Sequence, residues 1–362
     1  MAEYPDDLLG RPAPQAVAQI GLTLLEVTRA ALGRLEERSD TEALHDFRVG
    51  LRRLRSTFRT FRADVDDIVP KKVRNRLRDL MQETSGARDA EVLVAWIEKE
   101  APELARGKRA GIPWFLAQLA EQRDAAYEKI LHDVPARFGR VERRLRKTLA
   151  VSAKAGAGAA EGPPLAIRAA GLLAEYAAVL EQELASVRSS RDEEATHAAR
   201  ITAKRLRYLL EPLPLPEARK ALTHLKALQN LLGDLHDLHV LAAKLADSVG
   251  DAAAARARRQ HEIAVNGTAA RVAGTRQPRP ATTGLLALAQ HVRGAEDKAF
   301  RRFADEWRGT ADVQLWASLA ALGAALTTPA PAPAPTPTPA APAIPPVRRR
   351  VRHPRPDQRA VT

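Results

Sequence analysis

The sequence predicts an all-α protein, and three observations support this prediction. Alanine, leucine, arginine and glutamate dominate the 362 residues, aromatic residues make up only 4%, and runs of β-branched residues are scarce. Apolar residues recur at spacings of three and four, which is the period of an amphipathic helix. A charged pattern at residues 42–56 returns at residues 194–208. Because a repeat at a fixed offset indicates two similar units, we expect two structural halves that each present the same kind of surface.

Two stretches of unusual composition divide the chain. Residues 152–164 read SAKAGAGAAEGPP, which is typical of a flexible linker. The last 34 residues contain eleven prolines and a basic cluster, so we expect a disordered, extended Pro-rich tail. The expected segments are a flexible leader at 1–14, a first helical half at 15–151, the linker at 152–164, a second helical half at 165–308, a C-terminal helix at 309–328 and the tail at 329–362.

Proline, glycine and acidic residues mark the expected helix ends. Ser39, Asp40 and Thr41 offer side-chain oxygens that can cap the helix after them, and Pro135 predicts a break in a long helix. The expected helices span 15–37, 42–63, 71–83, 89–99 and 114–150 in the first half, then 165–187, 192–211, 216–232, 235–247, 252–273 and 283–307 in the second, followed by 312–326.

The helix expected at 42–63 carries a basic stripe beside an apolar one. Both sets of residues step by three or four, so each lies on one side of a helix. Helices that cover the apolar side also flank the basic side, and the pattern therefore predicts the wall of a basic groove. The basic stripe consists of His45, Arg48, Arg52, Arg55, Arg59 and Arg62, and the apolar stripe of Phe47, Leu51, Leu54, Phe58 and Phe61.

The second copy of this pattern lies 152 residues further along the chain. A second signature, at residues 80–93, also returns, at residues 228–241, and aligns Arg88-Asp89 with His236-Asp237. We expect each half to present the same kind of basic surface. The matched pairs of the stripe are His45 and His197, Arg48 and Arg200, Arg52 and Lys204, Arg53 and Arg205, and Arg55 and Arg207.

These paired motifs, H-x-x-R-V/I-x-x-R/K-R-L-R, each followed by a leucine-rich helix, resemble the CHAD domain, the conserved histidine α-helical domain. The resemblance covers residues 15–308. It implies two pseudo-symmetric antiparallel four-helix-type bundles with long helices, whose basic residues line a groove that binds inorganic polyphosphate. Arg53 and Arg205 lie about 130° from the stripe centre on a helix of 3.6 residues per turn, so the resemblance alone places them in the site. The residues that the family pattern selects are His45, Arg48, Arg52, Arg53, Arg55, His197, Arg200, Lys204, Arg205 and Arg207, and a second group adds Arg59, Lys71, Arg74, Arg78, Arg88, Lys226 and His236.

Charge and composition agree with a polyanionic partner. The net charge is +13 and the pI is about 10.3. The absence of cysteine excludes disulfides, thiolate metal sites and cysteine nucleophiles. The N-terminus is acidic and lacks the apolar segment of a signal peptide, and the apolar stretch 313–326 is too short to span a bilayer. We expect a cytoplasmic protein with no membrane partner, placed on polyphosphate granules.

Nucleic acid is an alternative partner, through weak non-specific contacts with the groove or with the basic residues 348–352. Proteins that bind single strands interleave aromatic and basic residues. Here Phe47, Phe58 and Phe61 fall on the apolar side, which leaves Tyr208 as the nearby candidate. No recognisable nucleic-acid-binding motif is present.

A metal-dependent polyphosphate or triphosphate hydrolase is a second alternative. Such sites assemble carboxylates around a cation, and residues 64–67 hold three aspartates, while His236 and His239 share a helix face. A turn explains the aspartates, and the pairing of His236 with Arg88 indicates a basic contact. Asp89 and Asp237 are interpreted as helix caps or as partners that orient basic side chains. We expect no enzymatic activity and no cofactor.

Overall fold

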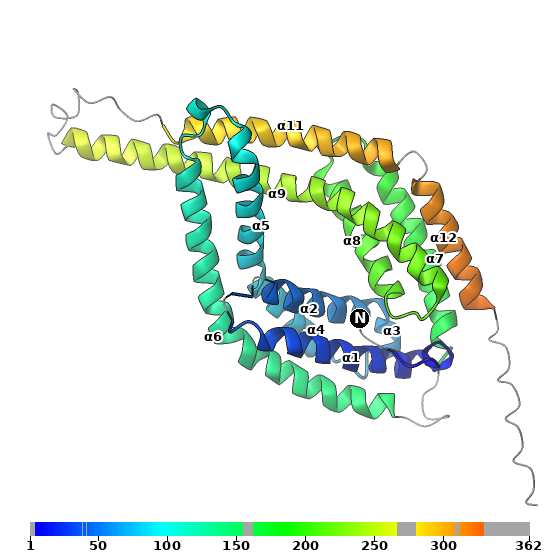
Figure 1. Cartoon of the computed structure of the whole chain (residues 1–362). Helices are drawn as coiled ribbons and strands as arrows, with labels where there is room; N and C mark the ends of the chain where they lie inside the picture. Colours follow the sequence, from blue (N-terminus) through cyan, green and yellow to red (C-terminus); the bar gives the residue numbers. More distant parts are fainter. Residues whose placement is uncertain are drawn as a thin grey trace, which may run out of the picture. The chain divides into compact units, whose positions relative to one another are not determined.

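The computed structural model describes residues 4–37, 39–40, 42–154, 162–265, 280–307 and 311–328. Over these ranges the chain is helical and has no β-strand longer than an isolated bridge, which confirms the all-α prediction (Figure 1). Residues 1–328 form one compact unit. The predicted tail lies outside the described residues, as do residues 155–161 of the predicted linker.

The helices follow the predicted order, apart from an additional short helix at 62–65, a helix that begins at Ser85 where residue 89 was expected, and two larger exceptions. Their bounds are α1 (Ala13–Gly33), α2 (Ala43–Thr60), α3 (Arg62–Val65), α4 (Lys71–Glu83), α5 (Ser85–Glu100), α6 (Ile112–Ala153), α7 (Leu165–Ser186), α8 (Glu193–Leu210), α9 (Pro216–Val265), α11 (Thr282–Glu306) and α12 (Asp312–Thr327), with short 3-10 helices at Leu8–Gly10, Ala101–Glu103 and Arg106–Lys108.

The two larger exceptions are helices that continue through a predicted end. The break expected at Pro135 is wrong, because α6 runs through this residue with Ile130, Val134 and Phe138 buried along one side. The three helices expected at 216–232, 235–247 and 252–273 form one helix, α9, over the described part of that range. A glycine inside a helix costs only about 1 kcal/mol relative to alanine, and burial of Leu232 and Leu235 on either side of Gly233 outweighs this cost.

Two apolar cores hold the unit together. The larger core joins α1, α2, α4, the second part of α6, α7, α8, the first part of α9 and α12. The smaller core joins α5 and the start of α6 with the middle of α9 and with α11. Both cores combine residues from the two halves of the sequence, because α6 and α9 each extend from one core to the other (Figure 1). The division into two pseudo-symmetric four-helix-type bundles stays a prediction.

The helix α1 is part of the larger core. By length and composition it could cross a membrane, but it packs on α2 and α6 with Val17, Ile20 and Leu25 buried. This packing accounts for its apolar sequence. The residues before it are also packed: Leu8 is fully buried, and the Ala13 amide donates a hydrogen bond to the Pro163 carbonyl oxygen (3.0 Å). This part of the predicted leader therefore belongs to the folded unit.

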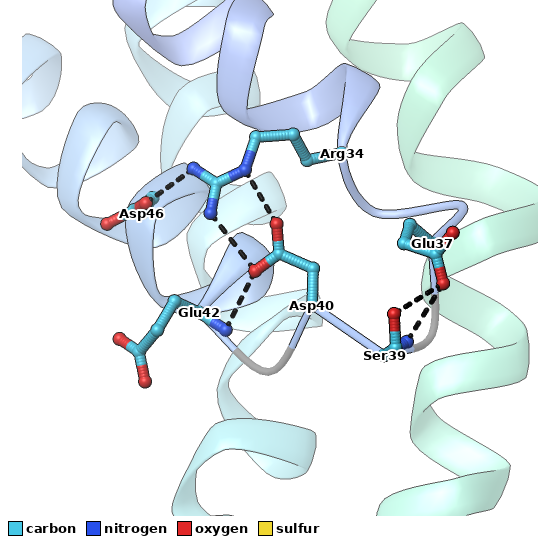
Figure 2. Close-up of polar contacts among 6 residues, drawn as sticks. All are labelled: Arg34, Glu37, Ser39, Asp40, Glu42 and Asp46. Carbon is cyan, nitrogen blue, oxygen red and sulfur yellow. Dashed lines mark hydrogen bonds and ion pairs between the residues drawn. The ribbon is translucent and has the colours of Figure 1, made fainter.

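A cluster of charged groups fixes the start of α2 against the end of α1 (Figure 2). Arg34 donates to Asp40 from Nε (2.7 Å) and Nη2 (3.0 Å), and to Asp46 from Nη1 (2.6 Å). The Asp40 carboxylate in turn accepts from the Glu42 amide (3.1 Å). The residue at the N-cap position of α2 is Glu42, which has no side-chain cap hydrogen bond, so Asp40 orders the turn before the helix instead of capping it. Ser39 contacts Glu37, and Thr41 lies outside the described residues. These contacts set where the basic stripe of α2 begins.

Candidate functional site

The apolar stripe of α2 is buried, as predicted. Phe47, Leu51, Leu54 and Phe58 are fully buried, and the Phe47 ring meets the edge of Phe138 on α6 with centroids 5.4 Å apart. The burial of this side fixes the rotation of α2 about its own axis. The basic stripe is therefore held at the border of the core.

The helix α8, which carries the second stripe, packs against α2. Glu211, directly after the end of α8, accepts from Arg53 Nε of α2 (2.7 Å) and lies 3.2 Å from Arg207 Nε of α8. One carboxylate thus holds an arginine from each half of the sequence. This contact explains Arg53, whose side chain points away from its own stripe and toward the other half.

The packing of α2 on α8 and of α8 on α9 gathers charged groups from four helices. Arg52 of α2 acts electrostatically on Arg200 and Lys204 of α8. Asp89 of α5 lies within electrostatic range of Arg48, Arg52 and Arg88 from the first half and of Arg200 from the second. We call this set the shared cluster: His45, Arg48, Arg52, Arg88, His197, Arg200, Lys204, Arg207 and His236, together with Asp89 and Asp237.

Arg48 is the most deeply placed cation of the shared cluster. It is only 6% exposed, and its Nη1 donates to the Met81 carbonyl oxygen (3.1 Å) and to Thr84 Oγ1 (2.9 Å) at the junction of α4 and α5. Burial lowers its pKa to about 10, with Asp89 opposing the shift. The hydrogen bonds make Arg48 an anchor for this junction as well as a source of positive charge.

Arg200, the matched residue of the second half, has a different environment. Its side chain is 20% exposed, and its Nη2 lies 3.7 Å from Asp237 Oδ1 on α9. Burial lowers the pKa of Arg200, and the charge of Asp237 opposes that shift. Asp237 lies inside α9 and cannot cap a helix, so the interpretation as a partner that orients a basic side chain is the one that the geometry supports.

The two carboxylates of the shared cluster remain accessible. Asp237 is 48% exposed and Asp89 is also exposed. Burial nevertheless raises the pKa of each, while the neighbouring guanidinium groups, Arg48 for Asp89 and Arg200 for Asp237, pull it back down. The helices around these groups therefore limit their hydration without closing them off from solvent.

The imidazoles of the shared cluster are held in the neutral form. His197 of α8 and His236 of α9 stack with ring centroids 5.1 Å apart and an interplanar angle of 32°. Burial, followed by the charge of Arg200, lowers the pKa of both rings, that of His236 to about 3. The pKa of His45 is lowered by burial and then by Arg88. At neutral pH these rings can donate one hydrogen bond each without adding charge.

A second group of cations lies further along α2. Arg55 has Arg59, Arg78 and Arg52 as electrostatic neighbours, and burial together with these charges lowers its pKa. Burial, and then the charge of Arg59, lower the pKa of Arg205 on α8. We call Arg55, Arg59, Arg78 and Arg205 the lateral group. It extends the positive charge of the shared cluster and again combines residues of both halves.

One predicted site residue, Arg74, has a structural partner instead. It forms an ion pair with Asp66 (2.6 Å) and donates to the Val69 carbonyl oxygen (2.6 Å), so it stabilises the turn before α4. Lys71 and Lys226 are exposed, and their part in the site stays a prediction. Arg88 belongs to the shared cluster but also pairs with Glu91 (2.9 Å), which offsets part of its charge.

Sequence reasoning missed the residues that hold the cations in place. Glu211 follows Arg207 by four residues, and this spacing was a usable signal for a helical ion pair. Gln229 of α9 accepts from Arg207 Nη1 (2.6 Å) and donates to the Ala203 carbonyl oxygen (2.7 Å), while Thr84 receives Arg48. No local pattern points to Gln229 or Thr84, because both contacts join different helices.

The candidate metal ligands have other partners. Asp64 binds Arg168 of α7 (2.9 Å), Asp66 binds Arg74, and His239 is buried with its Nε2 at 2.7 Å from the Ser190 carbonyl oxygen. In the part of the chain that the structure describes, no group of three or more histidine, aspartate or glutamate side chains is placed to hold a metal ion.

The segment that carries these residues matches a known protein family. Residues 22–246, which contain both basic stripes, match the family model of the CHAD domain. The chain belongs to the CHAD domain family. This CHAD protein is similar in fold to the crystal structure of the CHAD domain from the plant Ricinus communis, with a TM-score of 0.56 and 24% identity over 89% of this chain and 95% of that chain.

A second solved structure supports the same fold. PptA from Streptomyces chartreusis superposes with a TM-score of 0.53 and 19% identity over 82% of this CHAD protein and all of PptA (100%). No curated protein matches the sequence. At these identities the two solved structures establish the fold of the chain, and its ligand has to be argued from its own residues.

Proposed function

We propose that this CHAD protein binds inorganic polyphosphate at the shared cluster and the lateral group, and that it does not catalyse turnover of the polymer. The observation that supports the proposal is the meeting of Arg52 from one half with Arg200 and Lys204 from the other. The six arginine and lysine side chains of the cluster outnumber the carboxylates that oppose them, which are Asp89 and Asp237 within it and Glu91 and Glu211 at its border, so it carries excess positive charge. A linear polyanion can meet both halves at once.

The chemistry of the side chains fits a chain of phosphates. Arginine presents several N–H donors in a planar fork that matches phosphate oxygens, and neutral imidazole adds single donors. Binding a polyanion to several cations also releases condensed counterions, so affinity falls as the salt concentration rises. A long-chain polyphosphate gains from each added cation of the lateral group.

Nucleic acid offers the same charge but needs contacts with bases. Tyr208, the aromatic residue closest to the cluster in the sequence, is only 5% exposed. The Arg207 guanidinium lies 4.7 Å from its ring centroid, and Arg207 Nη2 is 2.8 Å from its hydroxyl oxygen. A ring covered in this way offers no platform for base stacking. This observation favours polyphosphate over single-stranded nucleic acid.

The proposal is tested by titrating long-chain polyphosphate, and single-stranded DNA of matched charge, at near-physiological salt. The variant is Arg52→Ala/Lys204→Ala, which removes one cation from each half. Its control is Arg143→Ala/Lys147→Ala, which removes the same charge from exposed positions of α6 that make no described ion pair. We expect tight binding of polyphosphate over DNA, weakened at least tenfold in the cluster variant and unchanged in the control. Equal binding of the two polymers, or equal loss in both variants, would contradict the proposal.

The non-catalytic part of the proposal and the granule location have separate tests. A binding protein leaves the length distribution of polyphosphate unchanged with and without Mg²⁺, whereas a hydrolase releases orthophosphate. A fluorescent fusion is expected to co-localise with polyphosphate granules, and the Arg52→Ala/Lys204→Ala variant is expected to lose that location. Release of orthophosphate by the purified protein, in amounts that scale with its concentration, would refute the non-catalytic assignment.

A further inference from the structure

Lys204 is the cation of the shared cluster with the least favourable surroundings. On α8 it lies one turn from Arg200 on one side and from Arg207 on the other, and Arg52 of α2 faces it from the first half. The side chain is partly buried. Among the described residues no carboxylate forms an ion pair with it, and Asp237 of α9, the acidic residue that acts on it most strongly, is 3.7 Å from Arg200.

A lysine in this position responds differently from the arginines around it. Arginine keeps its proton at any physiological pH, whereas lysine releases its proton when burial and like charges disfavour the ammonium form. Burial first, and then Arg200, Arg52 and Arg207, lower the pKa of Lys204 to about 6, and Asp237 only partly opposes the shift. At neutral pH the amine of the free protein is therefore mostly uncharged.

We propose that Lys204 is the proton acceptor of the site, so that a polyphosphate chain seated on the shared cluster restores its charge by drawing about one proton from solution. This inference rests on the proposed function and specifies how pH regulates the same site. The polyanion supplies the negative charge that the free cluster lacks beside Lys204. The proton binds the amine nitrogen and comes from the buffer, so that no further reactant is needed.

The direction of the pH dependence follows from linkage. Bound polyphosphate raises the pKa of Lys204 above its value in the free protein, so the complex binds more protons than the free protein between the two values. Affinity is then highest below about pH 6, where the free lysine is already charged, and falls about tenfold for each pH unit above it until the pKa of the complex is reached.

The other titrating groups around Lys204 act outside this range or in the same direction. His236 on α9 faces Arg200, His197 and Lys204, and its pKa of about 3 places its own response at lower pH. Asp237 and, on α5, Asp89 have raised pKa values, and their protonation in acid also makes the cluster more positive. Arg52, Arg200 and Arg207 hold their protons throughout. His197 on α8 and His45 on α2 also have lowered pKa values in the free protein, so a bound polyanion favours their protonated forms in the same direction. Lys204 adds its own proton to this response, and its contribution is the one that a Lys204→Arg substitution removes.

The test is isothermal titration calorimetry of the full-length protein with long-chain polyphosphate at pH 7.5, in two buffers with different ionisation enthalpies. Long chains are used because phosphate monoester-like ends titrate near pH 6 and would otherwise contribute protons. We expect uptake of at least about one proton per bound protein. Lys204→Arg, which keeps the charge but cannot titrate, should take up about one proton fewer than the wild type and bind about thirtyfold more tightly at pH 7.5. Lys147→Arg, an exposed lysine of α6, should behave as the wild type.

The outcomes separate this inference from the proposed function. Binding of polyphosphate with the same heat in both buffers would refute proton uptake and leave the proposed function intact. Proton uptake that persists unchanged in a helical Lys204→Arg protein would refute the role of Lys204. Failure to bind at every pH between 5.5 and 8.5 would refute the proposed function itself. The two-buffer measurement on the wild type decides the first outcome even where a variant does not fold.

Discussion

Arg48 and Arg200 occupy matched positions of the internal repeat but serve the molecule differently. Arg48 is 6% exposed and hydrogen-bonded to Met81 and Thr84, whereas the Arg200 side chain is 20% exposed and has its closest acidic contact, Asp237, at 3.7 Å. A repeat in the sequence therefore places matched side chains on the same side of their helices. The partners of each side chain depend on how the other helices pack around it. The first copy anchors the fold, and the second copy remains available to a ligand.

The largest expected difference between the two arginines is in the stability that each loses on truncation to alanine. Arg48→Ala removes a buried side chain and the two hydrogen bonds that it donates to Met81 and Thr84, and we expect the free energy of unfolding to fall by about 3 kcal/mol. Arg200→Ala removes a partly exposed contact and should cost less than about 1 kcal/mol. Urea denaturation of both variants measures the difference. Equal losses would contradict the assignment of Arg48 as an anchor.

Gly50 of α2 tests a second difference between the halves, which is how closely the helices approach each other. A Cβ at Gly50 would lie 2.3 Å from Thr28 Oγ1 and 3.0 Å from Thr28 Cβ on α1, whereas its counterpart in the second half is the buried Thr202. The pair α1 and α2 thus needs a close approach. Gly50→Ala should lower the free energy of unfolding by about 1–2 kcal/mol, because overpacking exceeds the gain in helix propensity.

The control for this substitution is a helical glycine with free space around it. A Cβ at Gly171 of α7 would meet no side chain and no other helix within 4 Å. Gly171→Ala should therefore be neutral or stabilise the protein by up to about 1 kcal/mol. Thermal unfolding followed by circular dichroism compares the two. A stable Gly50→Ala protein would show that α1 and α2 can separate without loss.

Removing the charge of Glu211, the carboxylate between the halves, should lower stability only slightly and should strengthen polyphosphate binding. Glu211→Gln keeps the shape of the side chain but removes the charge that faces Arg53 and Arg207. Because these pairs are partly exposed, we expect a loss of about 1 kcal/mol in the free energy of unfolding. Polyphosphate affinity should rise, since two guanidinium groups lose their competitor. Asp133→Asn, in an exposed pair with His132, is the matched control.

The fold class and the faces of α2 could be predicted from the sequence because they depend on local periodicity. Phe47, Leu51 and Phe58 are buried where the pattern placed them. The continuity of α9 through Gly233 could not be predicted, because leucines packed on other helices outweigh the local cost of glycine. Helix ends marked by a single residue are therefore the weakest part of such a prediction.

The candidate site was predictable in its residue types and less so in its contacts. The matched stripes indicated that Arg52 and Lys204 share a role, and the packing of α2 on α8 places them together. The same pattern could not separate Arg74, which stabilises a turn, from the cations of the shared cluster. That distinction depends on carboxylates and carbonyls brought close by tertiary packing, such as Asp66 and Val69.

The central claim is that both halves contribute to one site, and the stoichiometry of binding tests it most directly. Polyphosphate chains of defined length are titrated into the wild type, Arg52→Ala and Lys204→Ala under identical salt. We expect one binding event per protein, weakened by either substitution, because each removes a cation from the same cluster. Two independent events, with each substitution abolishing one and sparing the other, would contradict a shared site and assign a separate site to each half.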